Sequence, residues 1–461
     1  MAFQQALSGL NGASKAIDAT SNNIANASTV GYKASVAHFG DVYAASLAGA
    51  GASQIGIGIN LSGVQQQFTQ GNITATNNPL DISINGAGFF RMDQNGATTF
   101  TRNGQFHLDK NGFIINDQGM SLTGYTAQAG IIVPSTAAPL QISASDLAPV
   151  ATGSSVSGAF TGVRANLNLD SRLTPPVPAW ADGPAAAVPP ATSATWTPDP
   201  TTYNYSTALS VYDTLGNAHT LTMYFRKAQG TGDWAVFTNI DGTTNSRVTI
   251  SQPAGSPALA SVNIGTAAAP VNVPGIDFST SGALNSATAS PKLHLSVDMA
   301  GVMNDLGIPN NAASPLAFDL DFTGTTQFGS PVGTNRLEQD GYAAGHLVGL
   351  TAGADGVIQG RYSNGQTFAQ GQIVLANFTN PNGLQSLGNN QWTQTSASGP
   401  ALIGAPNTSS LGTLSSATVE ESNVDLTAEL VNLITQQRNY QANAQSIKTQ
   451  DQIMQTLVNL R

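Results

Sequence analysis

The sequence predicts a mainly β, nested multidomain fold with α-helical termini, in which the two terminal helices form a coiled-coil base and β domains are inserted between them. Three observations support this prediction. Apolar residues follow heptad spacing at both ends of the chain, and turn signals punctuate short β-branched or aromatic runs in the middle. The length, 461 residues, is sufficient for about three domains.

The first element is an N-terminal amphipathic helix. Positions 3, 7, 10, 14, 17, 21 and 24 alternate steps of four and three residues, with serines at 14 and 21 as polar insertions. Lys15 and Asp18 are the only charged residues within 1–31, so the flanks of this heptad are polar but uncharged. Such flanks suit packing among many like neighbours. The apolar members of the stripe are Phe3, Leu7, Leu10, Ile17 and Ile24.

The last segment repeats the heptad pattern and predicts a second amphipathic helix. Ser422 is a candidate N-cap, with Asp425 three residues later in the place of a capping-box carboxylate. The apolar and aromatic residues expected to pack on this helix are Leu426, Leu430, Leu433, Tyr440, Ile447, Met454 and Leu457.

The segments between the helices predict β-hairpins. Asn-Gly and Asp-Gly pairs favour tight turns because both residues tolerate positive φ. The stretch 170–200 contains two Pro-Pro pairs and an Ala-rich filler, and predicts a long loop within the central domain. The pairs that carry the hairpin signal are Asn95-Gly96, Asn103-Gly104, Asn111-Gly112, Asp241-Gly242, Asp355-Gly356 and Asn364-Gly365.

Two arrangements fit helical ends around a β middle. The chain could leave a helical base, build β domains outward and return to the base. Alternatively, two unrelated amphipathic helices could pack on separate β domains. Periodicity alone leaves both open.

Composition excludes several function classes. Only 9% of the residues are charged, against roughly 25% in ordinary soluble proteins, and the formal net charge is −10. This balance disfavours nucleic acid and anionic membranes as partners. The absence of cysteine excludes disulfides, thiolate catalysis and Cys-based metal sites. We also expect no cleaved signal peptide and no membrane insertion, because no basic N-terminal region and no apolar run of about 18 residues occurs.

No motif predicts a catalytic, cofactor-binding or metal site. The phosphate-loop, hydrolase-elbow and zincin signatures are missing, and the five histidines are expected on the surface or in hairpins. Asp109 to Gly119 hints at a calcium loop but lacks its terminal Glu, so a hairpin turn is the better interpretation. Gly86-Ala87-Gly88 is expected to be a tight turn. Nothing in the spacing of the carboxylates indicates a glycosidase pair.

Both ends of the chain resemble bacterial flagellar axial proteins, and most closely the hook-protein family. Residues 21–33, Ser-Asn-Asn-Ile-Ala-Asn-Ala-Ser-Thr-Val-Gly-Tyr-Lys, are similar to the rod-type signature of these proteins. Residues 78–90 and 100–125 resemble their shared β domain, and 422–443 resembles their C-terminal helix.

The middle of the chain points to the hook family, because rod subunits share both ends but are much shorter. Ser206-Thr207, Tyr212-Asp213 to Asn217, Tyr224-Phe225 and Trp234 resemble its outer domain. The returning strands are similar at 339–342, 360–365 and 380–384, whereas 170–200 and 243–320 match nothing recognisable.

The resemblance implies a structural subunit, not an enzyme, that polymerises into the flagellar hook, a curved hollow tube acting as universal joint between rod and filament in motility. The two apolar stripes would be buried on assembly, so that ordering and polymerisation are coupled. The implied domains are a terminal helical coiled coil (1–32 and 418–461), a connecting segment (33–77), an inner β domain (78–146 and 334–417) and an outer β domain (147–333).

The resemblance also implies a location and partners. The subunit would leave the cell through the flagellar type III export apparatus without a cleaved signal, and would lie outside the cell in the hook on the basal body. Phe39 and Tyr43 resemble the family's export-gate recognition pattern; the alternative is that both aromatics pack in the connecting segment. Implied partners are copies of the chain itself, the distal rod protein, the hook cap and the hook-filament junction protein.

Other functions stay open at this point. A flagellar rod or hook-associated subunit would share the ends of the chain. A secreted glycan-binding protein or glycosidase belongs to a different class and would remain monomeric with ordered ends.

Overall fold

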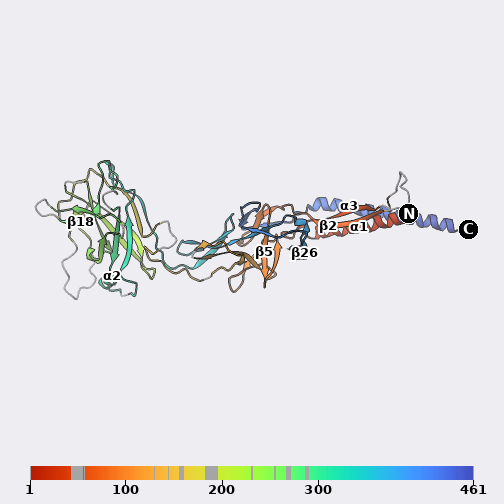
Figure 1. Ribbon diagram of the computed structural model, residues 1–461, viewed down its shortest axis with the longest axis horizontal. Coiled ribbons are helices and arrows are strands. Elements are labelled where there is room, and N and C mark those ends of the chain that lie inside the picture. The colour runs from red at the N-terminus through yellow and green to blue at the C-terminus, as the bar shows by residue number, and fades with distance from the viewer. Residues whose placement is uncertain are drawn as a thin grey trace. The chain divides into compact units, whose positions relative to one another are not determined.

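The computed structural model describes residues 2–42, 56, 58–128, 130–143, 145–154, 160–181, 196–229, 232–253, 256–265, 271–285, 290–308 and 310–459. The chain divides into two compact units. Unit 1 comprises residues 1–144, 348–361 and 367–461, and unit 2 comprises 145–347 and 362–366. Helices at both ends and strands between them confirm the predicted fold class (Figure 1).

The terminal helices are α1 (Ala2–Ala25) and α3 (Leu426–Asn459), both in unit 1. The N-cap of α3 is Asp425, not Ser422 as predicted, because Oδ1 of Asp425 accepts from the backbone N–H groups of Thr427 and Ala428 at 2.8 and 3.1 Å. Ser422 lies before the helix, where its hydroxyl accepts from the N–H of Val424 at 3.3 Å.

A large, mainly antiparallel sheet forms the centre of unit 1. The predicted turn at Asn95-Gly96 joins two of its strands, and both residues have positive φ, 54° and 89°. The main path of the sheet is, in order, β22 (Leu347–Ala352), β23 (Val357–Tyr362), β24 (Thr367–Ile373), β9 (Ser121–Gln128), β5 (Phe89–Gln94), β6 (Ala97–Thr101), β27 (Gln391–Thr393) and β26 (Gln385–Gly388). Shorter strands attached to it are β7 (His107–Leu108), β8 (Ile114–Ile115), β10 (Ile131–Ile132), β11 (Ala138–Pro139), β25 (Leu375–Asn377) and β28 (Leu402–Gly404).

Three two-stranded pairs connect the sheet of unit 1 to the terminal helices. β1 (Ser35–Val42) pairs with β2 (Gly58–Gln66) directly after α1. The other two pairs bring early and late parts of the chain together: β3 (Ile73–Ala75) with β30 (Thr418–Glu420), and β4 (Ile82–Asn85) with β29 (Thr413–Ser416). The chain before the sheet is therefore paired with the chain that leads into α3.

Aromatic side chains form a core on the sheet of unit 1. Phe89, Phe100, Phe378 and Trp392 are buried, and the half-buried Phe68 packs against them. Ring centroids lie 4.8 to 5.8 Å apart in edge-to-face arrangements, which the aromatic quadrupole favours.

Unit 2 consists of two five-stranded sheets that share one hydrophobic core. Buried residues of both sheets, such as Phe225, Trp234, Leu295 and Phe322, belong to the same cluster. The first sheet has the order β16 (Val248–Ser251), β19 (Lys292–Val297), β20 (Leu316–Asp321), β12 (Val163–Asn168), β21 (Gly333–Gln339). The second has the order β13 (Tyr205–Tyr212), β14 (Ala218–Lys227), β15 (Trp234–Ile240), β18 (Asn272–Ile276), β17 (Ala260–Asn263).

Helical segments in the β regions are short. α2 (Met299–Leu306) follows β19, with Asp298 as its N-cap and Gly307, at φ 68°, as its C-cap. Three 3₁₀ turns occupy Pro200–Thr202, Asn245–Arg247 and Pro381–Gly383.

The described parts of the predicted loop 170–200 pack on the second sheet of unit 2. Trp180 stacks on Phe237 with ring centroids 4.1 Å apart and planes 11° from parallel. The guanidinium of Arg226 donates to the carbonyl oxygens of Pro176 and Pro178 at 2.9 and 2.8 Å. A side chain of β14 thus holds the described part of this proline-rich segment, which forms no strand.

Candidate functional site: the paired terminal helices

The two terminal helices lie side by side and antiparallel in unit 1 (Figure 1). A Cβ on Gly9 of α1 would lie 3.0 Å from the side-chain amide of Asn443 in α3. Near the other end of α1, Nδ2 of Asn23 donates to Oε1 of Glu429 at 3.3 Å. The order of these contacts along the two helices is opposite, so α3 returns along the helix with which the chain begins.

Small side chains form the buried face of α1. Ala6, Ala13 and Ala16 are 6 to 7% exposed, and Thr20 and Asn23 are also buried. With Gly9, these residues follow heptad spacing one position before the predicted apolar stripe. Short side chains allow helix axes to approach closely, which explains why this stripe, and not the bulkier one, faces inward. Apolar spacing did not reveal it, although the alanines and glycine repeat with the same period.

The predicted apolar stripe of α1 is largely uncovered in the single chain. Phe3 and Leu7 are 50% and 43% exposed, and Leu10, Ile17 and Ile24 are half-buried. The stripe of α3 behaves similarly: Leu433 and Ile447 are half-buried, and the side chain of Leu457 lies outside the described part. The exposed residues predicted on α3 are Leu426, Leu430, Tyr440 and Met454, at 38 to 62%.

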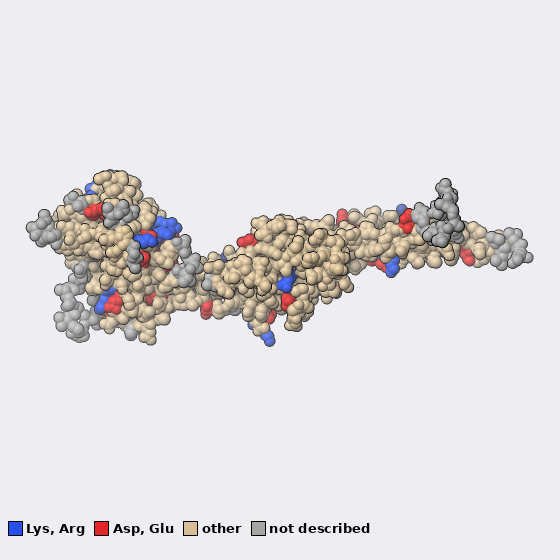
Figure 2. Space-filling view, viewed as in Figure 1, with Lys and Arg blue, Asp and Glu red and all other residues tan. Residues whose placement is uncertain are grey.

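Further exposed apolar side chains on α3 extend this surface. Val431, Ile434 and Ile453 are 59%, 51% and 49% exposed. Charged side chains are sparse on the visible face (Figure 2). The helical pair therefore presents apolar side chains at several exposed positions.

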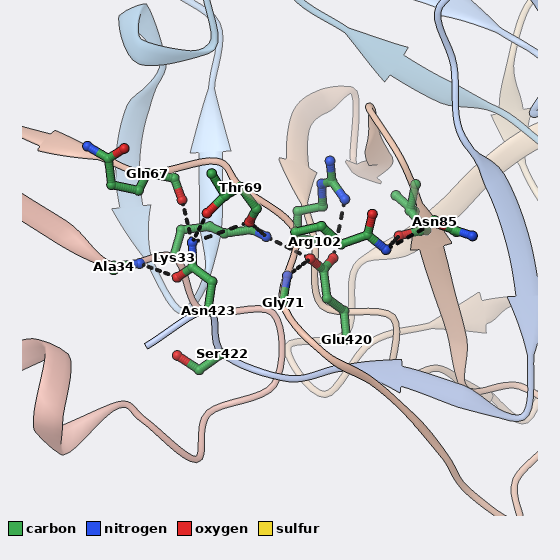
Figure 3. A network of polar contacts seen from close by, with 12 residues as sticks. Lys33, Ala34, Gln67, Thr69, Gly71, Asn85, Arg102, Glu420, Ser422 and Asn423 are labelled. Carbon is green, nitrogen blue, oxygen red and sulfur yellow. Dashed lines mark hydrogen bonds and ion pairs between the residues drawn. The ribbon is translucent and has the colours of Figure 1, made fainter. Parts of the chain in front are cut away.

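A buried ion cluster links the helical pair to the sheet of unit 1 (Figure 3). Glu420, on β30, accepts from Nζ of Lys33 at 2.7 Å and from Nη1 of Arg102 at 3.2 Å. The side chains of Lys33 and Glu420 are 0% exposed, and that of Arg102 is 4% exposed. Further donors and acceptors complete the cluster: Gly71 N–H donates to Glu420 at 2.9 Å, and Lys33 donates to the carbonyl of Thr69 at 2.7 Å.

Burial and the attraction between opposite charges act in opposite directions on the pKa values of the two cations in the cluster. Burial lowers the pKa of Lys33, and the charge of Glu420 opposes this effect. Burial likewise lowers the pKa of Arg102, again against the attraction of Glu420. One carboxylate thus holds two cations from separate segments, which satisfies charges that would be costly to bury alone.

Side-chain amides provide a second set of links beside the ion cluster. Asn423 accepts from the N–H of Ala34 at 2.7 Å and donates to the carbonyl of Gln67 at 2.7 Å (Figure 3). Asn23 accepts from the N–H of Ser35 at 2.8 Å and donates to the carbonyl of the same residue at 2.9 Å. Each asparagine side chain therefore both donates to and accepts from backbone groups, as a neighbouring strand would. Asn23 lies near the end of α1, and Asn423 lies just before α3.

Other sequence-predicted sites have simpler outcomes. Phe39, predicted for export recognition, is 39% exposed on β1, and Tyr43 lies outside the described residues. Asp109 forms a turn, with Oδ1 accepting from the N–H groups of Asn111 and Phe113. His219 lies in the hairpin of β13 and β14, one of the two settings predicted for the histidines, and its side chain is 5% exposed between two aspartates.

The described residues contain neither a cluster of metal-ligating side chains nor a membrane-spanning helix. Within the described ranges, no group of three or more His, Cys, Asp or Glu side chains is placed to hold a metal ion. No helix in this described portion is long and apolar enough to cross a bilayer.

Four family models match successive parts of the chain. They are described as flagella basal body rod protein (residues 3–33), flagellar hook protein FlgE/F/G D1 domain (83–145), flagellar basal body protein FlaE D2 domain (168–342) and flagellar basal body rod FlgEFG protein C-terminal (415–460). The first and last models cover the terminal helices described above.

Individual relatives match over the full length. The flagellar hook protein FlgE of Salmonella typhimurium is 38% identical, with 100% of both chains covered. That of Escherichia coli K12 is also 38% identical over 100% of both chains, and that of Treponema pallidum is 32% identical over 99% of this chain and 98% of its own. A crystal structure of Helicobacter pylori flagellar hook protein FlgE2 superposes with a TM-score of 0.45 at 13% identity, covering 74% of this chain and 98% of that one.

Sequence similarity to these relatives over the whole length of the chain supports a hook structural subunit. It does not favour a rod or hook-associated subunit, a secreted glycan-binding protein or a glycosidase. The chain therefore belongs to the flagellar hook protein family.

Proposed function

We propose that this chain polymerises with copies of itself into the flagellar hook by burying the exposed apolar stripes of α1 and α3, and that the resulting tube acts as universal joint between rod and filament. The observation that carries the proposal is the exposure of Phe3, Leu7, Leu426 and Leu430 on a helical pair whose own contact uses small residues.

The energetics favour assembly through this surface. Full burial of one large apolar side chain contributes about 1.5 to 3 kcal/mol, and among the described residues two such side chains on α1 and seven on α3 are at least 38% exposed. Heptad spacing repeats them along one face, so one subunit could make the same kind of contact with several neighbours. Few charges in the chain oppose close packing of like copies.

The division of the chain into working parts belongs to this proposal. The terminal coiled coil (1–32 and 418–461) would line the tube, and the connecting segment (33–77) would lead to an inner β domain (78–146 and 334–417) and an outer β domain (147–333). The ion cluster around Glu420 supports mechanical continuity between the helices and the adjacent sheet. It joins the segment that follows α1, through Lys33, to the segment that precedes α3, through Glu420.

Export and the partners are further parts of the proposal. The subunit would leave through the flagellar type III apparatus without a cleaved signal and assemble outside the cell, with Phe39 and Tyr43 contributing to recognition at the gate. The distal rod protein, hook cap and hook-filament junction protein would meet the same terminal helices at the ends of the polymer. We assign no catalytic role and no cofactor.

A charge placed on the exposed stripe tests the proposal. Leu430→Asp adds a charge at a 44% exposed position, so the monomer should keep its fold while polymerisation is lost. The measurement is electron microscopy of purified protein under salting-out conditions, with circular dichroism of the monomer.

Asn439→Asp is the matched control. Position 439 is also exposed, and it lies nine residues, or about 180°, around the same helix from Leu430. It should still form tubes. Normal tubes from Leu430→Asp would refute the assignment of this stripe.

A further inference from the structure

His219, at the start of β14 in unit 2, lies between two carboxylates. Its Nδ1 is 2.7 Å from Oδ2 of Asp241, and its Nε2 is 3.4 Å from Oδ2 of Asp213. A neutral imidazole has one N–H and one lone pair, whereas the imidazolium has two N–H donors. Because both neighbours are acceptors, only the charged ring can donate to both of them.

The two aspartates are themselves fixed by uncharged donors. Asp241 also accepts from the N–H of Thr220 at 2.7 Å. Asp213 accepts from Asn217 through both its backbone and its side chain at 2.9 Å, and from the side chain of Asn310 at 3.3 Å. Among the described residues, Asp241 and Asp213 are the charged groups that act on the ring. A neutral ring would therefore leave two carboxylates facing one another across it.

The loop that this cluster fixes, residues 213–217, joins β13 to β14 and contacts distant parts of unit 2. The position of a Cβ on Gly216, at φ 84°, is 2.6 Å from Pro149 and 3.2 Å from Ala343. The hydroxyl of Thr214 accepts from the N–H of Ala313 at 2.8 Å. Pro149 and Ala343 belong to the two segments by which the chain enters and leaves unit 2.

Those two segments are paired next to the loop. Val150 and Tyr342 form a bridge with backbone hydrogen bonds of 2.9 and 3.0 Å. Thr152 and Tyr212 exchange two hydrogen bonds, N–H of Thr152 to the carbonyl at 3.0 Å and N–H of Tyr212 to Oγ1 at 2.9 Å. Loosening the 213–217 loop would therefore loosen a junction of three segments.

The ionisation of the cluster agrees with its geometry. Burial by itself would lower the pKa of His219, but the hydrogen bonds and charges of Asp241 and then Asp213 outweigh it, and the pKa is raised. Burial opposes the ionisation of Asp213, yet its hydrogen bonds to Asn217, Leu215 and His219 hold its pKa below the usual value.

We propose that His219 is a pH-responsive clasp. As imidazolium, it holds the 213–217 loop against the incoming and outgoing segments of unit 2. When the ring loses its proton, the loop is released from these segments. A raised histidine pKa contributes stability that is present in full below about pH 6.5 and is lost as the pH rises through the folded-state pKa. On the acid side, stability is lost as the pH falls through the lowered pKa of Asp213. The clasp is a property of the folded subunit and does not depend on polymerisation.

Hydrogen exchange of the full chain, followed by mass spectrometry between about pH 6 and pH 9 and corrected for intrinsic rates, tests the clasp. Protection of peptides covering 205–227 and 340–347 should fall with rising pH, by up to about tenfold for each unit by which the pKa is raised. In His219→Gln the pH dependence should disappear. Equal pH dependence in wild type and His219→Gln would overturn the proposal.

His294→Gln is the matched control, because Nδ1 of His294 faces a single carboxylate, Asp319, at 2.7 Å and the side chain is 35% exposed. This variant should keep the wild-type response in the 213–217 loop. If His219→Gln does not fold, NMR titration of the His219 ring in the wild-type chain decides the matter. A pKa above 6.5 supports the clasp, and a pKa at or below 6.5 overturns it.

Discussion

Gly9 of α1 lies directly against Asn443 of α3, and a Cβ at Gly9 would come within 3.0 Å of both heteroatoms of the asparagine amide. Ala6 and Ala13, about one turn to either side of Gly9, are buried, so small side chains form this part of the buried face of α1. Glycine costs about 1 kcal/mol of helix propensity relative to alanine, and close approach at this position offsets that cost.

We predict that Gly9→Leu separates the N-terminal half of α1 from α3, because the new side chain has no space beside Asn443. The helix content of the monomer should fall, measured by circular dichroism at 222 nm, and proteolysis within residues 2–16 should become faster. Asn11→Leu, at an exposed position of the same helix, is the control and should change neither. Wild-type protease resistance in Gly9→Leu would contradict the antiparallel pairing.

The ion cluster yields a prediction for stability. Glu420→Gln leaves Lys33 and Arg102 buried without a counter-charge, and breaking a buried ion pair by removing one partner costs about 3 to 5 kcal/mol. Chemical denaturation, followed by Trp392 fluorescence in a variant lacking the other tryptophans, measures the loss for unit 1.

Glu421→Gln provides the comparison for the ion cluster. This neighbour is exposed and its carboxylate accepts one long hydrogen bond, 3.4 Å, from Asn72, so loss of the charge should change the free energy of unfolding by less than about 0.5 kcal/mol. Equal stabilities of the two variants would mean that Glu420 is not the centre of the cluster.

Heptad spacing predicted the two helices because it is a local signal that spans many residues, but it left open whether they share a base. Family resemblance then selected the nested arrangement. The inward face of α1 was missed, because a stripe of Ala6, Gly9 and Ala13 has little hydrophobic contrast with its surroundings. Apolar periodicity detects where large side chains are, and here the large side chains lie mostly outside the intramolecular contact.

Contacts between distant segments were not predictable from spacing. Lys33 and Glu420 are 387 positions apart, and no local pattern marks either as buried. The hairpin setting of His219 agrees with its prediction, but its burial between two aspartates was not predictable, because these aspartates belong to separate turns that only the pairing of β14 with β13 and β15 brings to the ring. Long-range topology, which a single sequence expresses weakly, determines both sites.

Arg226 provides a prediction for the proline-rich segment of unit 2. Its guanidinium donates to the carbonyls of Pro176, Pro178 and Thr202, and Arg226→Met would leave these acceptors without their partner. We expect a loss of roughly 1 to 3 kcal/mol and faster proteolysis within residues 170–181. Arg172→Met is the control on the segment itself, because Arg172 is exposed and pairs with Asp170. An unchanged cleavage rate in Arg226→Met would show that other contacts hold the segment without Arg226, such as the stacking of Trp180 and the hydrogen bonds from Lys227 to the carbonyls of Ser171 and Leu173.

The bridge between Leu147 and Gly345 yields a prediction about nesting. Their backbones exchange hydrogen bonds of 2.7 and 3.2 Å, so the incoming and outgoing chains are already paired at this point. Replacing residues 148–344 with an Asn-Gly turn should therefore close the chain as a short hairpin without strain. The sheet of unit 1, its aromatic core and the ion cluster lie outside the deleted range, so we expect one cooperative thermal transition and intact α1–α3 pairing. A shortened chain that unfolds without cooperativity would show that unit 1 needs unit 2 to fold, and would argue against a nested architecture.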